Sequence, residues 1–311
     1  MKLKILIAVY NDWSSLDILL AKINNNLKAT KWSNYEVYIV NDASTLEVPS
    51  EIKKKVKIIN LFNNIGSQGA LSIGVKYIQD KDKDITHLLI MDSDGEDKPH
   101  DIIRLLDECN KNESNIVFAK RKKRKENFIF RIMHFIYKKV FKILIGKELD
   151  FGNFSCMTKN NLNKIVNINN LQTHYAASIL RSKIPFSKID CEKGFRIEGS
   201  SKLSFWKHFA HALMSLSVFV DLIAIKFFFI SFLGIILSII SAFIIFLMKI
   251  YYSQMLLGLT SDILLSLAII LIVLFLVSLF SLIIFLNNKN LSYTSSNKSV
   301  DHLIESVDDL S

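Results

Sequence analysis

Four carboxylates stand within six residues of this chain, directly after an apolar run that reads as a β-strand. They are Asp92, Asp94, Glu96 and Asp97. Carboxylates this close repel one another unless a cation joins them, and hard oxygen ligands suit Mg²⁺ or Mn²⁺. The twelve-residue loop of an EF-hand calcium site is absent. We therefore expect a divalent metal ion here; the alternative is a solvated acidic turn before Pro99.

Three more polar clusters follow apolar runs earlier in the chain. They comprise Val9 to Asp12, Asn41 to Ser44, and Asn63 to Ala70, where a helix is expected to begin. Ligands of parallel sheets bind at the carboxyl ends of the strands, so all four clusters are expected to share one crevice. This joint pattern predicts a nucleotide site. Gly66 and Gly69 have neither GxGxxG nor GxxxxGK[ST] spacing, which disfavours a Rossmann dinucleotide site and a P-loop.

The elements that must position these clusters alternate in type over the first 120 residues. Their order predicts βαβ units, and therefore an α/β fold with a mostly parallel sheet and flanking helices. Strand-like runs lie at 3–9, 35–40, 56–60, 87–91 and 115–119, and helix-like stretches near 14–27, 68–79 and 99–111.

Two long apolar runs near the C-terminus predict a transmembrane hairpin. Residues 227–248 and 263–286 carry no charge, and about 20 such residues cross a hydrocarbon core. The connector between them is short, so both ends of the hairpin are expected on the same side. The distribution of Lys and Arg predicts that this side is the cytoplasm. We expect a multi-pass protein of the cell inner (plasma) membrane.

One basic block accounts for the charge of the whole chain. Residues 120–147 hold eleven Lys or Arg and one acid, and the chain's formal net charge is +10. Residues 128–146 have apolar side chains on one helical face and basic ones on another, which predicts a helix at a membrane surface. An ordinary surface helix is the alternative. Nucleic-acid binding through Lys120 to Lys125 is disfavoured because no nucleic-acid module is present.

Composition excludes several classes of protein. Ten glycines and three prolines are too few for a collagen-like or a low-complexity disordered chain. The three cysteines, Cys109, Cys156 and Cys191, never form a CxxC pair. They fit a reducing compartment and predict neither a disulfide scaffold nor a zinc site.

Taken together, the motifs resemble family 2 inverting glycosyltransferases of the GT-A fold. The nearest resemblance is to the branch of polyprenyl-phosphate glycosyltransferases and dolichyl-phosphate mannosyltransferase. It covers residues 3–221, and the hairpin also matches that branch. Two departures are a missing Arg in the segment Asp150 to Ser155 and a Glu96 where many relatives have Gln. The segments that carry the resemblance are Ala8-Val9-Tyr10-Asn11, Asn41-Asp42-Ala43-Ser44, Asn64-Ile65-Gly66 through Ala70, Met91-Asp92-Ser93-Asp94, and Arg196 to Leu203, which reads R-x-x-G-x-S-K-L.

The resemblance implies a role for each matching residue. Asp94 and Glu96 would bind Mg²⁺ or Mn²⁺, and Asp42 would hydrogen-bond the nucleotide base. The expected catalytic residues are Asp92, Asp94, Asp97 and Asp150, of which Asp97 and Asp150 are the candidate general bases. The expected nucleotide-sugar-binding residues are Ala8, Tyr10, Asn11, Asp42, Asn64, Gly66 and Asp92. Those expected to bind the phosphates of donor and acceptor are Arg121, Arg131, Arg196, Ser201 and Lys202.

The expected activity is inverting, metal-dependent transfer of a sugar, of the hexosyltransferase type. The donor would be a nucleotide sugar and the acceptor an undecaprenyl-type polyprenyl phosphate, used in cell-surface glycan synthesis. An ionised phosphate needs no strong base, whereas a sugar hydroxyl needs a carboxylate to take its proton. A hydroxyl of a lipid-linked or surface glycan is therefore the alternative acceptor, and a non-catalytic membrane scaffold is the second alternative. The expected partners are donor, lipid acceptor and bilayer, without nucleic acid, and a homo-oligomer stays open.

These expectations divide the chain into four parts. Residues 1–202 would form a cytoplasmic GT-A catalytic domain, in which 120–147 is the basic membrane-surface segment. Residues 203–225 would form an interfacial helix, and 226–289 the two transmembrane helices. Residues 290–311 would be a flexible polar tail.

Overall fold

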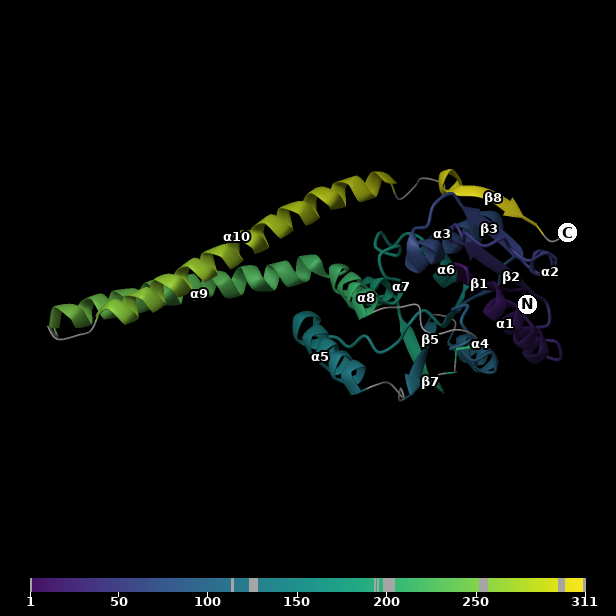
Figure 1. Ribbon diagram of the computed structural model, residues 1–311, viewed down its shortest axis with the longest axis horizontal. Coiled ribbons are helices and arrows are strands. Elements are labelled where there is room, and N and C mark those ends of the chain that lie inside the picture. The colour runs from purple at the N-terminus through teal and green to yellow at the C-terminus, as the bar shows by residue number, and fades with distance from the viewer. Residues whose placement is uncertain are drawn as a thin grey trace. The chain divides into compact units, whose positions relative to one another are not determined.

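Strands and helices alternate through most of the chain in this computed structural model, which describes residues 2–112, 115–122, 128–192, 194, 196–197, 205–251, 257–295 and 300–309 (Figure 1). The strands are β1 (Leu3–Val9), β2 (Tyr35–Asn41), β3 (Lys57–Leu61), β4 (His87–Ile90), β5 (Ile116–Lys122), β6 (Ser155–Thr158), β7 (Phe186–Glu192) and β8 (Ile304–Asp308). The helices are α1 (Trp13–Leu27), α2 (Ser50–Lys53), α3 (Gly66–Lys81), α4 (Asp101–Lys111), α5 (Phe128–Ile145), α6 (Lys159–Ile165), α7 (Tyr175–Ser182), α8 (Phe205–Ser217), α9 (Val220–Tyr251) and α10 (Leu257–Ser295), with a 3₁₀ turn at Asp301–Leu303.

The described strands form one sheet in the order β7-β5-β6-β4-β1-β2-β3-β8. Strands β4, β1, β2 and β3 are parallel neighbours, β6 is antiparallel to both β4 and β5, and β8 is antiparallel to β3. This confirms the expected mostly parallel sheet with flanking helices. The five strands expected from the sequence are present with ends shifted by no more than a few residues, and β6, β7 and β8 were not foreseen.

The centre of the sheet is buried on both faces because its strands are apolar at successive positions. All of β4 is buried, and β1 is buried except at Ala8. Alternate side chains of β1 pack with apolar residues of α1 and α4 in one core cluster. On the other face α3 comes so close that a Cβ at Gly74 would lie 2.5 Å from a methyl carbon of Leu6. Helices therefore cover both faces and leave the carboxyl edge of the sheet for ligands.

The C-terminal segment returns to the sheet after the apolar helices. Strand β8 pairs with β3 in the register Ile59↔Val307 and Asn60↔Ser306. Residues 304–308 fall in the segment 290–311 that was expected to be a flexible polar tail, and α10 also runs on to Ser295. The physical reason is that β3 would otherwise be an edge strand with unpaired backbone groups, and a short polar strand can satisfy them.

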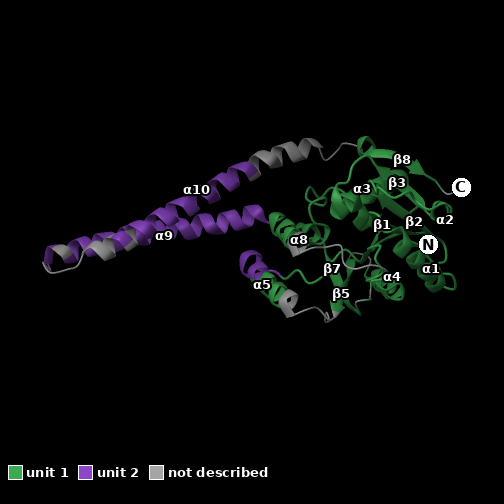
Figure 2. Cartoon of the chain, viewed as in Figure 1, with its two compact units in different colours: residues 1–139, 148–218, 296–311 green, residues 140–147, 219–295 purple. Residues whose placement is uncertain are grey.

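A second compact unit contains 140–147 and 219–295, and it consists mainly of α9 and α10 (Figure 2). The segments Val220–Met248 and Leu265–Ile284 have mean hydropathies of 2.8 and 3.3, with only 11% and 6% of the residues in their most apolar windows buried. The two helices pack antiparallel, since Phe228 contacts Phe275 and Gly234 lies against Leu271. Their length and composition suit a membrane-crossing hairpin, with helices longer than the spans expected at 227–248 and 263–286.

Candidate active site

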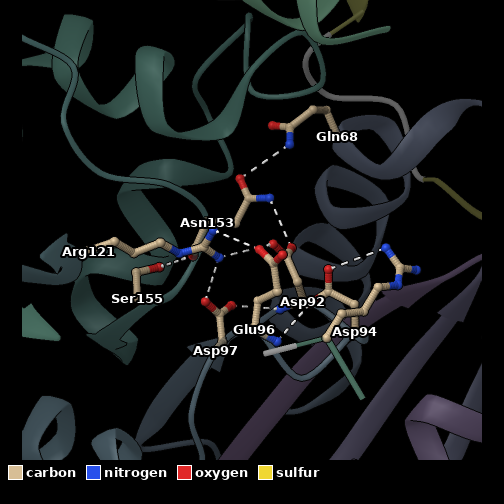
Figure 3. A network of polar contacts seen from close by, with 9 residues as sticks. Gln68, Asp92, Asp94, Glu96, Asp97, Arg121, Asn153 and Ser155 are labelled. Atoms are coloured by element: carbon tan, nitrogen blue, oxygen red, sulfur yellow. Dashed lines mark hydrogen bonds and ion pairs between the residues drawn. The ribbon is translucent and has the colours of Figure 1, made fainter. Parts of the chain in front are cut away.

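The carboxyl edge of the sheet brings Arg121 to the acidic loop 92–97. That loop follows β4, and Arg121 is the next-to-last residue of β5. Because β6 is antiparallel to both strands, β4 and β5 point the same way and end at the same edge. The guanidinium nitrogens of Arg121 lie 2.7 Å from Asp97, 3.3 Å from Glu96 and 3.8 Å from Asp92 (Figure 3). One cation therefore faces three of the four predicted carboxylates.

Asp97 holds this loop in shape from the inside. Its side chain is only 1% exposed, and its Oδ1 accepts the hydrogen bond from Arg121. Its Oδ2 accepts from the backbone N–H of Asp92 at 3.1 Å. The loop turns at Gly95, whose φ of +78° lies in the left-handed region that favours glycine. Both carboxylate oxygens of Asp97 are thus used for structure.

A second segment, which comes much later in the sequence, holds the loop through backbone hydrogen bonds. Gly194 donates its N–H to the carbonyl of Glu96 at 2.8 Å, and Ile197 donates to the carbonyl of Asp94 at 3.0 Å. A Cβ at Gly194 would lie 2.7 Å from the Gly95 carbonyl oxygen, so this approach requires glycine. The clamp places Arg196 with its guanidinium 3.2 Å from Asp12 and 3.8 Å from Asp94.

An amide relay fixes the orientation of Asp92. Tyr175 donates its N–H to Oε1 of Gln68 at 2.7 Å, and Nε2 of Gln68 donates to Oδ1 of Asn153 at 3.2 Å. Nδ2 of Asn153 then donates to Oδ1 of Asp92 at 3.2 Å. Gln68, Asn153 and Asp12 were not foreseen as site residues. Asp12 and Gln68 do lie in two of the polar clusters that follow strands, and Asn153 lies in the segment where the sequence departs from the family pattern.

Among the described side chains of the site, carboxylates outnumber guanidinium groups. Burial, and then the nearby Asp97 carboxylate, raise the pKa of Asp92 to about 6. Burial and the charge of Asp92 also raise the pKa of Asp94. Burial acts to lower the pKa of Arg121, but the surrounding carboxylates outweigh it and raise that pKa. Burial raises the pKa of Asp97 even though Arg121 opposes the shift.

This excess of negative charge fits a divalent cation, whose own charge would relieve the repulsion. Asp94 and Glu96, the predicted ligands, are in the same loop, and the backbone N–H of Glu96 donates to Oδ1 of Asp94 at 3.0 Å. In the described part of the chain no three His, Cys, Asp or Glu side chains form a metal cage. An ion at this loop would therefore need further ligands from the substrate, as Mg²⁺ commonly takes from phosphates.

Two strained turns build the neighbouring side of the crevice. Asn11 and Ala43 have φ of 54° and 51°, in the region that few residues other than glycine adopt. The turns hold each other, because Asn11 donates its N–H to Oγ of Ser44 and its Oδ1 accepts from the N–H of Leu46. Tyr10, beside Asn11, is 45% exposed. The predicted nucleotide-binding residues Tyr10 and Asn11 are thus at the strand edge, and their roles stay predictions.

Asp42 is buried, although a residue that contacts a ligand at the protein surface does not need to be. It is 2% exposed, and its Oδ1 accepts from the N–H of Ile65 at 2.8 Å where α3 begins. Its carbonyl accepts from Nδ2 of Asn64 at 3.0 Å. Burial raises the pKa of Asp42, while hydrogen bonds from Ile65 and Gly66 act against that rise. Asp42, Asn64 and Gly66 are therefore brought together, and Ala8 lies half-buried near the end of β1.

Asp150 lies in a different ionic setting from the acidic loop. It is paired with Lys120 at 2.9 Å and Lys188 at 2.8 Å. Burial alone would raise the pKa of Asp150, but hydrogen bonds from both lysines outweigh it and lower that pKa. The predicted phosphate ligands Ser201 and Lys202, and the side chain of Arg131, lie outside the described residues.

Comparison with known proteins places these features in a family. Residues 4–170 match the family model described as Glycosyl transferase family 2. The uncharacterized glycosyltransferase sll0501 from Synechocystis is 26% identical over 77% of this chain and 75% of its own length. The uncharacterized glycosyltransferase YkcC from Bacillus subtilis is 30% identical over 41% of this chain and 39% of its own.

Solved structures share the fold at low identity. A glucosyl-3-phosphoglycerate synthase from Mycobacterium tuberculosis, crystallised with Mn²⁺, uridine-diphosphate-glucose and phosphoglyceric acid, superposes with a TM-score of 0.52. The match covers 71% of this chain and 79% of that chain at 8% identity. At this identity the likeness concerns the fold alone.

The Arg121 pair yields a test of the site's architecture. Arg121→Met is expected to lower the free energy of unfolding by about 3 kcal/mol, because it leaves the buried Asp97 carboxylate unpaired. It should also abolish glycosyl transfer. Thermal melting and turnover of the purified chain would measure the two effects.

A matched control exists on α4, where Arg104 pairs with Asp101, another carboxylate that is 1% exposed. Arg104→Met should cost less stability, because the Arg104 side chain is 54% exposed, and should leave turnover intact. Normal turnover by the Arg121 variant would show that this arginine is not part of the active site.

Proposed function

The chain belongs to glycosyl transferase family 2, and on that basis we propose that it transfers a sugar from a nucleotide-sugar donor to a polyprenyl phosphate at a membrane surface. The observation that carries the proposal is the loop 92–97 held against Arg121 at the carboxyl edge of the sheet. This is where a donor diphosphate, a metal ion and an incoming anionic acceptor need to meet.

In an inverting transfer, the acceptor oxygen forms a bond to the anomeric carbon as the bond from that carbon to the diphosphate oxygen breaks. The electron pair leaves with the diphosphate, so negative charge grows there. Arg121 and Arg196 supply fixed positive charge for it. Asp94 and Glu96 would hold Mg²⁺ or Mn²⁺, which supplies further charge neutralisation when bound. The M. tuberculosis synthase that shares the fold was crystallised with Mn²⁺ and uridine-diphosphate-glucose, which supports the use of a divalent ion.

Asp97 and Asp150, the two carboxylates predicted as general bases, are both engaged by basic groups, which supports an acceptor that needs no proton removed. Asp97 uses both oxygens to hold Arg121 and the loop backbone. Asp150 is tied to two lysines and has a lowered pKa, which makes it a weaker base. A lipid phosphate is already ionised at neutral pH and needs no proton removed. The roles of Asp97 and Asp150 are thus proposed to be structural.

The described helices offer a surface suited to a bilayer. Helix α5 exposes Phe135, Ile136 and Ile143, the last of these 73% exposed, and Lys138 and Lys142 are interleaved with them. Exposed apolar side chains beside lysines are typical of a helix lying in the interfacial region of an anionic membrane. We propose that residues 120–147 contact the membrane surface and that 226–289 cross it.

The sheet also constrains topology. Strand β8, which follows α10, is hydrogen-bonded to β3 in the same sheet as β1. The N-terminal domain and the C-terminal strand must therefore lie on the same side of a membrane, which requires an even number of crossings. Two spans satisfy this requirement, and the Lys/Arg distribution favours the cytoplasmic side.

Metal dependence is tested at Asp94. Asp94→Asn keeps the size of the side chain but removes its charge, and it is expected to lower sugar transfer at least about 100-fold while the domain stays folded. EDTA should stop transfer by the wild type, and added Mn²⁺ should restore it. Full activity in excess EDTA would refute the metal assignment.

The acceptor is tested by incubating membranes that contain the chain with radiolabelled nucleotide sugars and undecaprenyl phosphate, then extracting the lipid. Label is expected in a lipid-phosphate sugar, and Asp150→Asn should change the rate less than about threefold, because no base is needed. An inactive Asp150→Asn variant with label only in a lipid-linked glycan would establish the hydroxyl alternative. Nucleotide binding without any transfer would favour the scaffold.

Topology is tested with reporters. One inserted at residues 252–256, between α9 and α10 and outside the described part of the chain, is expected to be extracytoplasmic. One fused after residue 311 is expected to be cytoplasmic, because β8 belongs to the catalytic sheet. Finding both on one side would rule out the hairpin, and finding the sides exchanged would rule out the proposed orientation alone.

A further inference from the structure

The C-terminal strand β8 is hydrogen-bonded to the side chain of one asparagine of β3, close to the proposed donor site. Asn60 of β3 donates from Nδ2 to Oγ of Ser306 at 2.9 Å and to Oδ2 of Asp308 at 3.3 Å. Both acceptors belong to β8, more than 200 residues away in sequence and beyond the two apolar helices. These contacts are side-chain bonds added to the backbone ladder between the strands. They join β8 to a side chain of β3 in addition to the backbone pairing at the sheet edge.

From Asn60 the contacts continue across the sheet. Asn41 of β2 is the register partner of Asn60, and its Nδ2 donates to Oδ1 of Asn60 at 2.9 Å. Oδ1 of Asn41 accepts the N–H of Ser44 at 3.0 Å. Oγ of Ser44 accepts the N–H of Asn11 at 3.0 Å. One chain of hydrogen bonds therefore runs from β8 to both strained turns of the proposed donor site.

The chemistry of a primary amide makes this chain directional. Each amide has a donor end and an acceptor end, so fixing one end fixes the other. The acceptors on β8 hold the NH₂ end of Asn60 toward the tail, which leaves its oxygen facing Asn41. Asn41 then presents its own oxygen to the turn at Ser44. Removing the acceptors on β8 would leave the NH₂ group of Asn60 without these partners, so its side chain, which accepts from Asn41, would be held less firmly.

Space for a ligand lies beside this chain. A cavity of about 430 Å³ is lined by residues of the two strand ends, the turn after β2 and the tail. Its lining includes Asn41, Ala43, Ser44, Asn60, Ser306 and Asp308. The tail therefore borders the same hollow as the turn that follows β2.

We propose that Ser306 and Asp308 are positioning residues of the donor site: the strand that follows the membrane hairpin holds the 41–44 and 11–12 turns in the shape that binds a nucleoside diphosphate. This inference rests on the proposed function for the identity of the ligand. The residues act through Asn60 and Asn41, without touching the donor or the reacting atoms. The tail thereby couples donor affinity to the folding of the chain beyond the membrane segments.

The test uses the full chain purified in detergent, with the double variant Ser306→Ala/Asp308→Ala. Its Kd for UDP or GDP with Mn²⁺, and its donor KM, are expected to rise roughly 3- to 10-fold, the effect of losing one or two positioning hydrogen bonds. The kcat should stay within about twofold, because Arg121 and the acidic loop are untouched. The single variant Asp308→Asn leaves Ser306 intact and keeps an acceptor oxygen at position 308. It should therefore retain most of the wild-type affinity.

Asp309→Ala is the matched control. It removes one negative charge at the residue that follows Asp308. The Asp309 carboxylate is exposed and pairs with Lys57, which is not part of the chain of hydrogen bonds. Its Kd should equal that of the wild type, and all variants should melt within a few degrees of it. An unchanged Kd in the double variant, or an equal loss in Asp309→Ala, would overturn the positioning role.

The two proposals fail in different ways. Normal nucleotide binding without transfer to a lipid phosphate would refute the proposed acceptor. The positioning role would then still be tested by the nucleotide Kd of the β8 variants. Absence of nucleotide binding by the wild type would refute both. If the double variant does not fold, the single variants Ser306→Ala and Asp308→Ala are each expected to raise the Kd for the nucleotide by a smaller factor.

Discussion

The ion pair between Arg121 and Asp97 is the interaction on which the rest of the site depends. Asp97 is buried, and one of its oxygens holds the backbone of Asp92 while the other holds the guanidinium. A buried carboxylate is costly when unpaired, so the loop and the end of β5 must be positioned together. The same guanidinium also faces Asp92 and Glu96, where like charges would otherwise push the loop apart. The pair thus allows several acids to remain close together where a diphosphate and a metal ion are proposed to bind.

The antiparallel strand β6 makes this arrangement available. Because it lies between β4 and β5, those two strands run in the same direction and both deliver their last residues to one edge. The chain enters β6 at that same edge, which places Asn153 beside Asp92. A site that looks like a single acidic loop in the sequence is therefore assembled from three strand ends and from the clamp at Gly194 and Ile197.

The sequence predicted the parallel strands and the clusters at their ends, because apolar periodicity and polar turns are local signals. It did not predict the partners of those clusters. Gln68, Asn153 and Tyr175 form a relay whose members are separated by as many as 107 residues. Gln68 lies in one of the polar clusters that follow strands, but no local pattern marks the three residues as partners. The sequence predicts Asp97 as a candidate base, whereas its pairing with Arg121 depends on tertiary structure and has no local signal. The segment that forms β8 is short and polar, so only the open edge of β3 explains why it becomes a strand.

The position of β8 has a consequence for how the protein is made. Its residues are synthesised only after both apolar helices. Until then β3 presents an open edge in an otherwise formed sheet, and an open edge can pair with other chains. Completion of the sheet must therefore wait until the segment beyond α10 has been made and has paired with β3. A chain truncated before β8 would keep that edge exposed, so the open edge of β3 is a physical mark of an incomplete chain.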